Sequence, residues 1–236
     1  MSDFNDRLDP ARFLADLAGT LHVQTGLEQT ARIVALAVPM LVSDAVGSVA
    51  LATRRQLVPA AAGSPALELA EQAQVELDEG PAVDVLKGAS AVLVPDLLVE
   101  SPWPQWTPTA IDAGWRSWLS LQLTSGTGQL IGVLSLASPA ADAFDPGHTG
   151  WIKLLASHAT VALDAARVRA HLAVAMDNHA RIGHGLGILM ERYGIDEEQA
   201  FVVLRKQAQD HGRKLRDVAT ELTRTGRLAE PDRRPN

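Results

Sequence analysis

The stretch "WIKLLASHATVALDAARVRAHLAVAMDNHARIGHGLGILMERYG" (residues 151–194) decides the fold, because no proline or turn cluster interrupts its helical pattern. Its apolar and small residues recur at alternating steps of four and three, the heptad pattern of a helix that packs along another helix. A helix of about 45 residues is too long to bury such a seam on one small domain, so the sequence predicts a parallel dimer or a multi-helix stalk. The predicted seam consists of Leu154, His158, Val161, Ala165, Val168, Leu172, Ala175, His179, Ile182, Leu186 and Leu189.

Three glycines lie near the end of this helix, and each costs about 1 kcal/mol of helix stability relative to alanine. Gly183 and Gly187 are four residues apart and share one face, which would allow another helix or an RNA backbone to approach closely. We therefore expect these two glycines to pack tightly inside the C-terminal helical unit. Gly185 is expected to point away from them, and it is the candidate weak point of the helix.

Two shorter helices follow. Asp196 and Gln199 form the capping-box pattern at the start of a helix predicted over 196–211, and a last helix is predicted over 214–226. With the end of the long helix they predict an all-α three-helix unit over 171–228. Residues 229–236 are predicted to be a disordered tail.

The first part of the chain, residues 10–170, predicts an α+β domain. Its Val-, Ala- and Leu-rich runs are separated by turn residues, which favours an antiparallel sheet. Amphipathic spacing predicts a helix over 9–40, with Gly26 as its candidate break. The predicted strands are 46–52, 56–63, 90–98, 115–123 and 130–138, and further helices are predicted over 65–80 and 81–88.

Composition limits the classes of protein that fit. The chain has 236 residues, 47% hydrophobic, and no cysteine, which excludes disulfides and thiolate metal sites. Because no apolar run is long enough to span a membrane and no leader pattern opens the chain, we expect a cytoplasmic protein without membrane contact. The net charge is −8 over residues 1–174 and +1 over 175–236. Such a basic end indicates either nucleic-acid contact or a solvated helix face.

Catalysis has little support. No G-x-S-x-G, Walker A or H-E-x-x-H motif appears, and no two histidines are four residues apart. We therefore expect no catalytic residue, no metal and no cofactor. An enzyme with an unrecognised pocket stays open as a rival interpretation, which two or more converging buried ionisable side chains would support.

Residues 182–226, "IGHGLGILMERYGIDEEQAFVVLRKQAQDHGRKLRDVATELTRTG", resemble an ANTAR domain, the small three-helix RNA-binding module of bacterial antitermination regulators. The resemblance implies that basic residues of its second and third helices meet RNA phosphate and that Tyr193 stacks on a base, whereas Phe201 is assigned to the core. The implied RNA-binding residues are Arg205, Lys206, Arg213, Lys214, Arg216 and Tyr193. The matching pieces are Gly183, Gly187, "ILM" (188–190), "AF" (200–201), "LR" (204–205) and "KLRDVA" (214–219).

Residues 12–170 resemble a GAF domain of the type found ahead of ANTAR in bacterial regulators. The segments that carry the resemblance are "DEGPAVDVLKGASAVLVPDL" (78–97), "WRSWLSLQL" (115–123) and the region from "LIGVLSLAS" (130–138) onward. It implies an antiparallel-sheet sensor domain for a ligand or partner, with terminal helices that pair in dimers. Four tryptophans border the region that closes the GAF pocket, so they are either ligand-pocket candidates or core residues: Trp103, Trp106, Trp115 and Trp118.

These features together predict a non-enzymatic transcription antitermination regulator. It would sense a ligand or partner through GAF and bind paired RNA hairpins through ANTAR as a homodimer. The alternative is a dimeric ligand-binding or protein-interaction module with degenerate RNA binding. Leu186 and Ala208 favour that alternative, because the family often has a basic residue at the first position and a small hydroxyl residue at the second.

Overall fold

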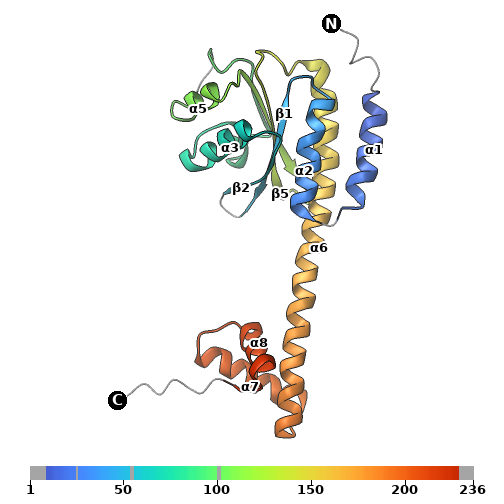
Figure 1. Ribbon diagram of the computed structural model, residues 1–236, viewed down its shortest axis with the longest axis vertical. Coiled ribbons are helices and arrows are strands. Elements are labelled where there is room, and N and C mark those ends of the chain that lie inside the picture. Colours follow the sequence, from blue (N-terminus) through green and yellow to red (C-terminus); the bar gives the residue numbers. More distant parts are fainter. Residues whose placement is uncertain (1–8, 25, 54–55, 100–101, 229–236) are drawn as a thin grey trace. The chain divides into compact units, whose positions relative to one another are not determined.

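The computed structural model describes residues 9–228 apart from 25, 54–55 and 100–101 (Figure 1). The chain divides into two compact units, Met1–Arg169 and Ala170–Asn236. One helix, α6 (Pro146–Tyr193), belongs to both, and the predicted continuous helix is therefore confirmed. The tail predicted over 229–236 lies outside the described residues.

The first unit is built on a five-stranded sheet in which every neighbouring pair is antiparallel, in the order β2-β1-β5-β4-β3. Pro59 lies on the edge strand, where its missing N–H removes no bond from an inner ladder. A register shift between Val49 and Ala50 marks a bulge in the pairing of the first two strands. The strands are β1 (Val46–Ala52), β2 (Leu57–Ala62), β3 (Ala91–Val94), β4 (Ser117–Thr124) and β5 (Leu130–Ser138).

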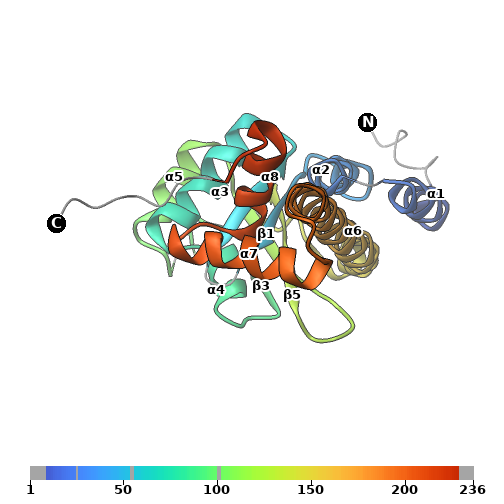
Figure 2. The same cartoon turned by 90° about the horizontal axis from the view of Figure 1, so that it is seen from below.

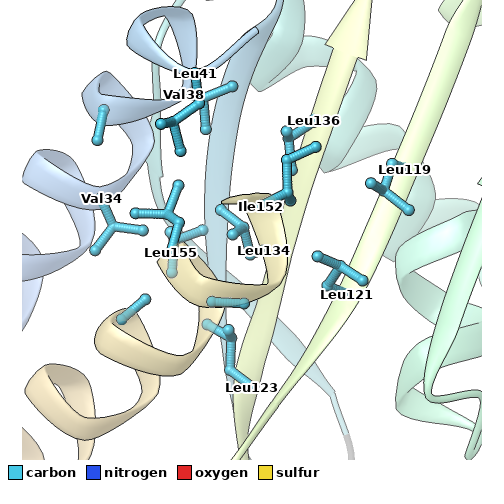
Figure 3. Packing of buried hydrophobic residues seen from close by; sticks show 14 of the residues in the cluster. Val34, Val38, Leu41, Leu119, Leu121, Leu123, Leu134, Leu136, Ile152 and Leu155 are labelled. Atoms are coloured by element: carbon cyan, nitrogen blue, oxygen red, sulfur yellow. The ribbon is translucent and has the colours of Figure 1, made fainter. Parts of the chain in front are cut away.

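One face of the sheet is covered by α2 (Leu27–Ala37), the 3₁₀ turn η2 (Val38–Met40) and the first part of α6. The first helix, α1 (Pro10–His22), lies beside these helices and farther from the sheet (Figures 1 and 2). The predicted helix over 9–40 is thus divided, and Gly26 is the residue that precedes α2. In Figure 3, Val34 and Leu155 lie between the helices and the strand residues Leu134 and Leu136. This interdigitated layer is the largest core of the unit.

The opposite face of the sheet is covered by α3 (Pro65–Leu77), α4 (Pro81–Leu86) and α5 (Trp106–Asp112). Ser64 caps α3 by accepting a hydrogen bond from the Leu67 N–H at 3.2 Å, as its position in the sequence predicts. Val133 and Ala137 of β5 point into this side, while Leu134 and Leu136 point to the other. The period of two residues therefore gives β5 two buried faces.

The second unit consists of the last part of α6, α7 (Glu197–Asp210) and α8 (Leu215–Thr225). The capping box is present: the Gln199 N–H donates to Asp196 Oδ1 at 2.8 Å. Gly226 ends α8 with a φ of 67°, a backbone conformation that favours glycine. Eight buried residues form the core of this unit: Leu186, Leu189, Ala200, Leu204, Ala208, Val218, Ala219 and Leu222.

The expectation for the glycines of α6 is wrong. A Cβ on Gly185 would lie 3.1 Å from the Ala219 Cβ and 3.2 Å from its Cα, whereas a Cβ on Gly183 or Gly187 would meet nothing within 4 Å. Gly185 is three residues after Ile182 and four before Leu189, so it shares their core-facing side. The close approach of α8 to α6 therefore depends on Gly185, and the other two glycines are exposed.

We expect Gly185→Val to lower the free energy of unfolding of the second unit by about 1–3 kcal/mol, because the added carbons overlap Ala219. Urea unfolding followed by circular dichroism measures this loss. The control is His184→Val, since His184 is the exposed neighbour on the same helix and histidine and valine have similar helix propensities. Equal losses in the two variants would contradict the packing role of Gly185.

Candidate ligand cavity and nucleic-acid interface

The four tryptophans proposed for a ligand pocket lie in the core on the α3–α5 side of the sheet. Trp106 and Trp118 are fully buried, and their ring centroids are 5.1 Å apart at 89°, an edge-to-face contact. The indole N–H of Trp103 donates to Asp84 Oδ2 at 3.1 Å and that of Trp106 donates to the Ala70 carbonyl at 2.9 Å. Their space is filled by their own packing, and none of the four lines the cavity described next.

A cavity of about 730 Å³ lies at the β2 edge of the sheet. Small side chains, Ala60, Ala61 and Ala62, leave this space open along the strand. Polar groups from the two flanking helices complete its wall. The lining residues are Glu28, Gln29 and Arg32 of α2, Ser48, Val49 and Ala50 of β1, Pro59–Ala62 of β2, and Glu68 and Glu71 of α3. The wall combines these small apolar side chains with polar and charged groups, which suits a small polar molecule.

Glu71 is the buried ionisable group of this cavity, with 4% of its surface exposed. Ser48 Oγ donates to Glu71 Oε1 at 2.6 Å, and Gln74 Nε2 donates to Oε2 at 3.1 Å. Burial raises the pKa of the Glu71 carboxyl, and the hydrogen bonds from Ser48 and Ser135 oppose that rise. Ser135 continues the polar chain to Ser120 at 3.0 Å. The carboxyl is therefore held in place by a buried hydrogen-bond network.

The proposed RNA-binding residues fall into two groups in the second unit. Arg213, Lys214 and Arg216 are consecutive or nearly so at the junction of α7 and α8. Lys214 is exposed and precedes the first residue of α8, where the positive end of the helix dipole adds to its charge. Arg213 forms an ion pair with Glu221, and this pairing lowers the pKa of the Glu221 carboxyl.

The second group consists of Arg205 and Lys206, both exposed on α7. Arg205 lines a groove of about 480 Å³ together with Leu186, Phe201 and Val202. Tyr193 is 57% exposed and is the last residue of α6. Within the described part of the chain, no hydrogen bond or ion pair joins Arg205 or Tyr193 to the α7–α8 junction. The expectation that Phe201 lies in the core is wrong, because 37% of its surface is exposed beside Arg205.

Comparison with known families identifies both units. Residues 24–164, more than half of the chain, match the family model of the GAF domain. Residues 170–222 match that of the ANTAR domain. The chain belongs to the GAF family and carries an ANTAR domain after its GAF domain. No curated protein matches the chain in sequence.

Solved structures agree on the GAF fold. The GAF domain of an Acinetobacter phosphoenolpyruvate-protein phosphotransferase is 15% identical with a TM-score of 0.52, covering 72% of this chain and 99% of that one. The corresponding Coxiella burnetii GAF domain is 18% identical with a TM-score of 0.53, covering 69% and 96%. Free methionine-R-sulfoxide reductase of Neisseria meningitidis, solved with its substrate, is 19% identical with a TM-score of 0.54, covering 71% and 94%. At these identities the likeness shows the fold alone.

Sequence reasoning missed the GAF cavity, although one signal was available. The buried side of α3 repeats at Leu67, Ala70, Glu71 and Gln74, so a carboxyl and an amide stand on an otherwise apolar face. Such a pattern indicates that the helix faces polar partners inside the protein. The small residues of β2 carried no comparable signal, because alanines also suit an ordinary edge strand.

The described residues contain no group of three or more histidine, aspartate or glutamate side chains arranged to hold a metal ion. No helix among them combines the length and the hydropathy that crossing a membrane requires.

We expect Glu71 to make the GAF domain less stable as pH rises. The folded carboxyl has a raised pKa and retains its proton at pH values where the unfolded one, near 4.5, has lost it. Stability therefore falls by up to about 1.4 kcal/mol per pH unit between the unfolded and the folded pKa. Urea unfolding across pH measures the slope. Glu71→Gln should remove that slope, and identical pH profiles of the two proteins would contradict the assignment.

Proposed function

We propose that this protein is a non-enzymatic transcription antitermination regulator. Its ANTAR domain binds paired RNA hairpins, its GAF domain senses a small ligand or a partner, and α6 pairs two copies into a dimer. The observation that carries the proposal is the exposed basic junction of α7 and α8 inside a matched ANTAR domain. Stabilising one RNA structure over a competing one requires binding and no covalent step.

Hairpin binding suits the charges of the junction. Lys214 and Arg216 reach phosphate oxygens from the first turn of a helix, where exposed N–H groups add further donors. Specific contact with RNA usually involves bases splayed out in a loop, which stack on aromatic side chains. Tyr193 and Phe201 are the two exposed aromatic residues described in the ANTAR domain.

The dimer is supported by an apolar strip on the GAF part of α6. Val161 and Val168 of the predicted seam are 71% and 57% exposed. They line a groove of about 430 Å³ with Ala165, beside the β4–β5 turn residue Gly126. A second α6 would cover this strip. An uncovered helix of this length would be marginal in water from residue 167 to 181, where none of its residues is buried.

Ligand sensing is supported by the cavity at the β2 edge of the GAF domain. Its volume of about 730 Å³ suits a small molecule. Among the lining residues that the structure describes, only Glu71 combines an ionisable group with burial, whereas Glu28, Arg32 and Glu68 are exposed. Two or more such groups converging would support the rival interpretation of an enzyme, whereas a single buried carboxyl favours binding.

We expect the double variant Lys214→Ala/Arg216→Ala to weaken binding of two-hairpin RNA at physiological salt by at least about tenfold. The slope of log affinity against log salt should fall by about two, one for each lost phosphate contact. Filter binding or fluorescence anisotropy with hairpin and scrambled RNA measures both. Arg12→Ala/Lys153→Ala removes the same charge from exposed sites of the GAF domain and is the control. Equal affinity for scrambled RNA would favour the alternative of a dimeric interaction module.

We expect Leu172→Glu to weaken dimerisation by at least about tenfold, because it places like charges opposite each other across a symmetric seam. Analytical ultracentrifugation of the full chain measures the dissociation constant. Val174→Glu is the matched control: the two side chains are 59% and 58% exposed, but Val174 lies on the opposite side of α6. A monomeric native chain, or equal effects of both variants, would contradict the α6 dimer.

A further inference from the structure

The ANTAR part of α6 has an uncharged, exposed face that the fold leaves uncovered. Its members are separated by steps of four, three, four, four and three residues, an average of 3.6, so they lie on one side of the helix. All of them are exposed, Leu172 and Met176 to 59% and 65%. This open face consists of Leu172, Met176, His179, Gly183, Gly187 and Met190.

The open face is not the end of the predicted heptad seam. Leu186 and Leu189 of that seam are buried in the ANTAR core, and Ile182 packs against it. These side chains are occupied by α7 and α8, so they cannot meet another helix. Past His179, the surface that remains for a partner runs through Gly183 and Gly187 instead.

No contact within one copy of the chain requires glycine at position 183 or 187. Each lowers the helix propensity of α6, and a Cβ on either would meet nothing within 4 Å. Gly185, between them, is explained by its contact with Ala219. Two glycines four residues apart on an exposed face form a flat surface that a second backbone can approach closely.

The chemistry of the open face favours a second copy of this chain over RNA. None of its members carries a formal charge, whereas an RNA backbone requires cations against its phosphates. Arg181 lies on the opposite side of α6 and is paired with Asp177 at 2.8 Å. Arg169, one turn before Leu172, donates a hydrogen bond to the Gln24 carbonyl. A two-fold dimer brings each face against its own copy, and an uncharged face meets itself without repulsion.

A groove beside the open face extends the surface onto α7. Leu186, Phe201 and Val202 form its apolar part, and Phe201 and Val202 are 37% and 49% exposed. Its rim carries both signs of charge, with Glu197 and Glu198 at the start of α7 and Arg205 two turns later. A symmetric partner therefore brings a cation toward these carboxylates and a carboxylate toward this cation.

We propose that two copies of this chain dock through the open face of their ANTAR domains, with the helices crossing closely at Gly183 and Gly187. The inference rests on the proposed dimer and adds a second contact to it, inside the RNA-binding domain. That contact fixes the separation of the two α7–α8 junctions. The dimer would then present its two basic surfaces at a set distance to the two hairpins of one RNA.

The test is the variant Gly183→Ala/Gly187→Ala in the full chain. Alanine fits each site within one copy, so helicity and midpoint of unfolding at low protein concentration should be equal or higher. The dimer dissociation constant, measured by analytical ultracentrifugation, should rise at least tenfold because the added methyl groups separate the helices. Gly150→Ala, another exposed α6 glycine with nothing within 4 Å, should leave the dissociation constant unchanged.

Cross-linking gives an independent readout, because the native chain has no cysteine. Met190→Cys should form a disulfide between two copies under mild oxidation, because it lies on the open face. Arg181→Cys, on the opposite side of the same helix, should not. Equal cross-linking of the two variants, or an unchanged dissociation constant for the glycine variant, would overturn the proposal.

The outcomes separate this inference from the proposed function. If the native chain is a monomer, both the α6 dimer and this contact fail together. If Leu172→Glu weakens the dimer but Gly183→Ala/Gly187→Ala does not, the α6 dimer stands and the proposed close crossing at Gly183 and Gly187 fails. If the glycine variant keeps its dimer and loses hairpin affinity, the open face receives RNA, which overturns the docking of a second copy.

Discussion

A single helix must supply buried side chains to two separate cores, and this constraint governs the rest of the structure. In the GAF domain, α6 contributes Ile152, Leu155 and Leu163 to the layer against the sheet. In the ANTAR domain it contributes Leu186 and Leu189 to the three-helix core. Between these sets the backbone hydrogen bonds of the helix are satisfied internally, but its apolar side chains are not covered. The helix is thus continuous in hydrogen bonding and discontinuous in packing, which is why its exposed parts point to a partner.

In the GAF domain, the tryptophan cluster and the cavity lie in different places and have different physical causes. Trp103, Trp106 and Trp118 pack edge to face, and their indole N–H groups donate hydrogen bonds to neighbouring residues. Their side chains therefore fill the core and leave no open space. The cavity lies instead beside the alanines of β2 and the buried carboxyl of Glu71, which accepts hydrogen bonds from polar neighbours. Small side chains leave space, and a buried carboxyl with its hydrogen-bond partners makes purely apolar packing there unfavourable.

Periodicity and capping signals predict most of this fold. The continuous α6, the capping box of α7, the Gly226 stop of α8 and the antiparallel sheet all follow from local pattern or from family resemblance. The pattern could not say which side of α6 is buried, because leucines and alanines occur on several sides of the helix. That choice is made by α7 and α8, which take Leu186 and Leu189 and bring Ala219 against Gly185. The same packing of α7 and α8 against α6 leaves Phe201 exposed, although the sequence assigns it to the core.

The two domains can be coupled through α2, because this helix takes part in both the cavity and the main GAF core. Glu28 and Arg32 line the cavity, while Val34 of the same helix packs in the cluster that contains Ile152 and Leu155 of α6. In the proposed function, a ligand that draws the exposed side of α2 toward β2 would move its buried side as well, since close-packed layers transmit small shifts. Under the same proposal, the packing of α2 against α6, the helix that the proposed dimer pairs, would change with it. In this scheme the ligand acts by its different affinity for two arrangements of α2, and the RNA-binding surfaces respond through the helix that both domains share.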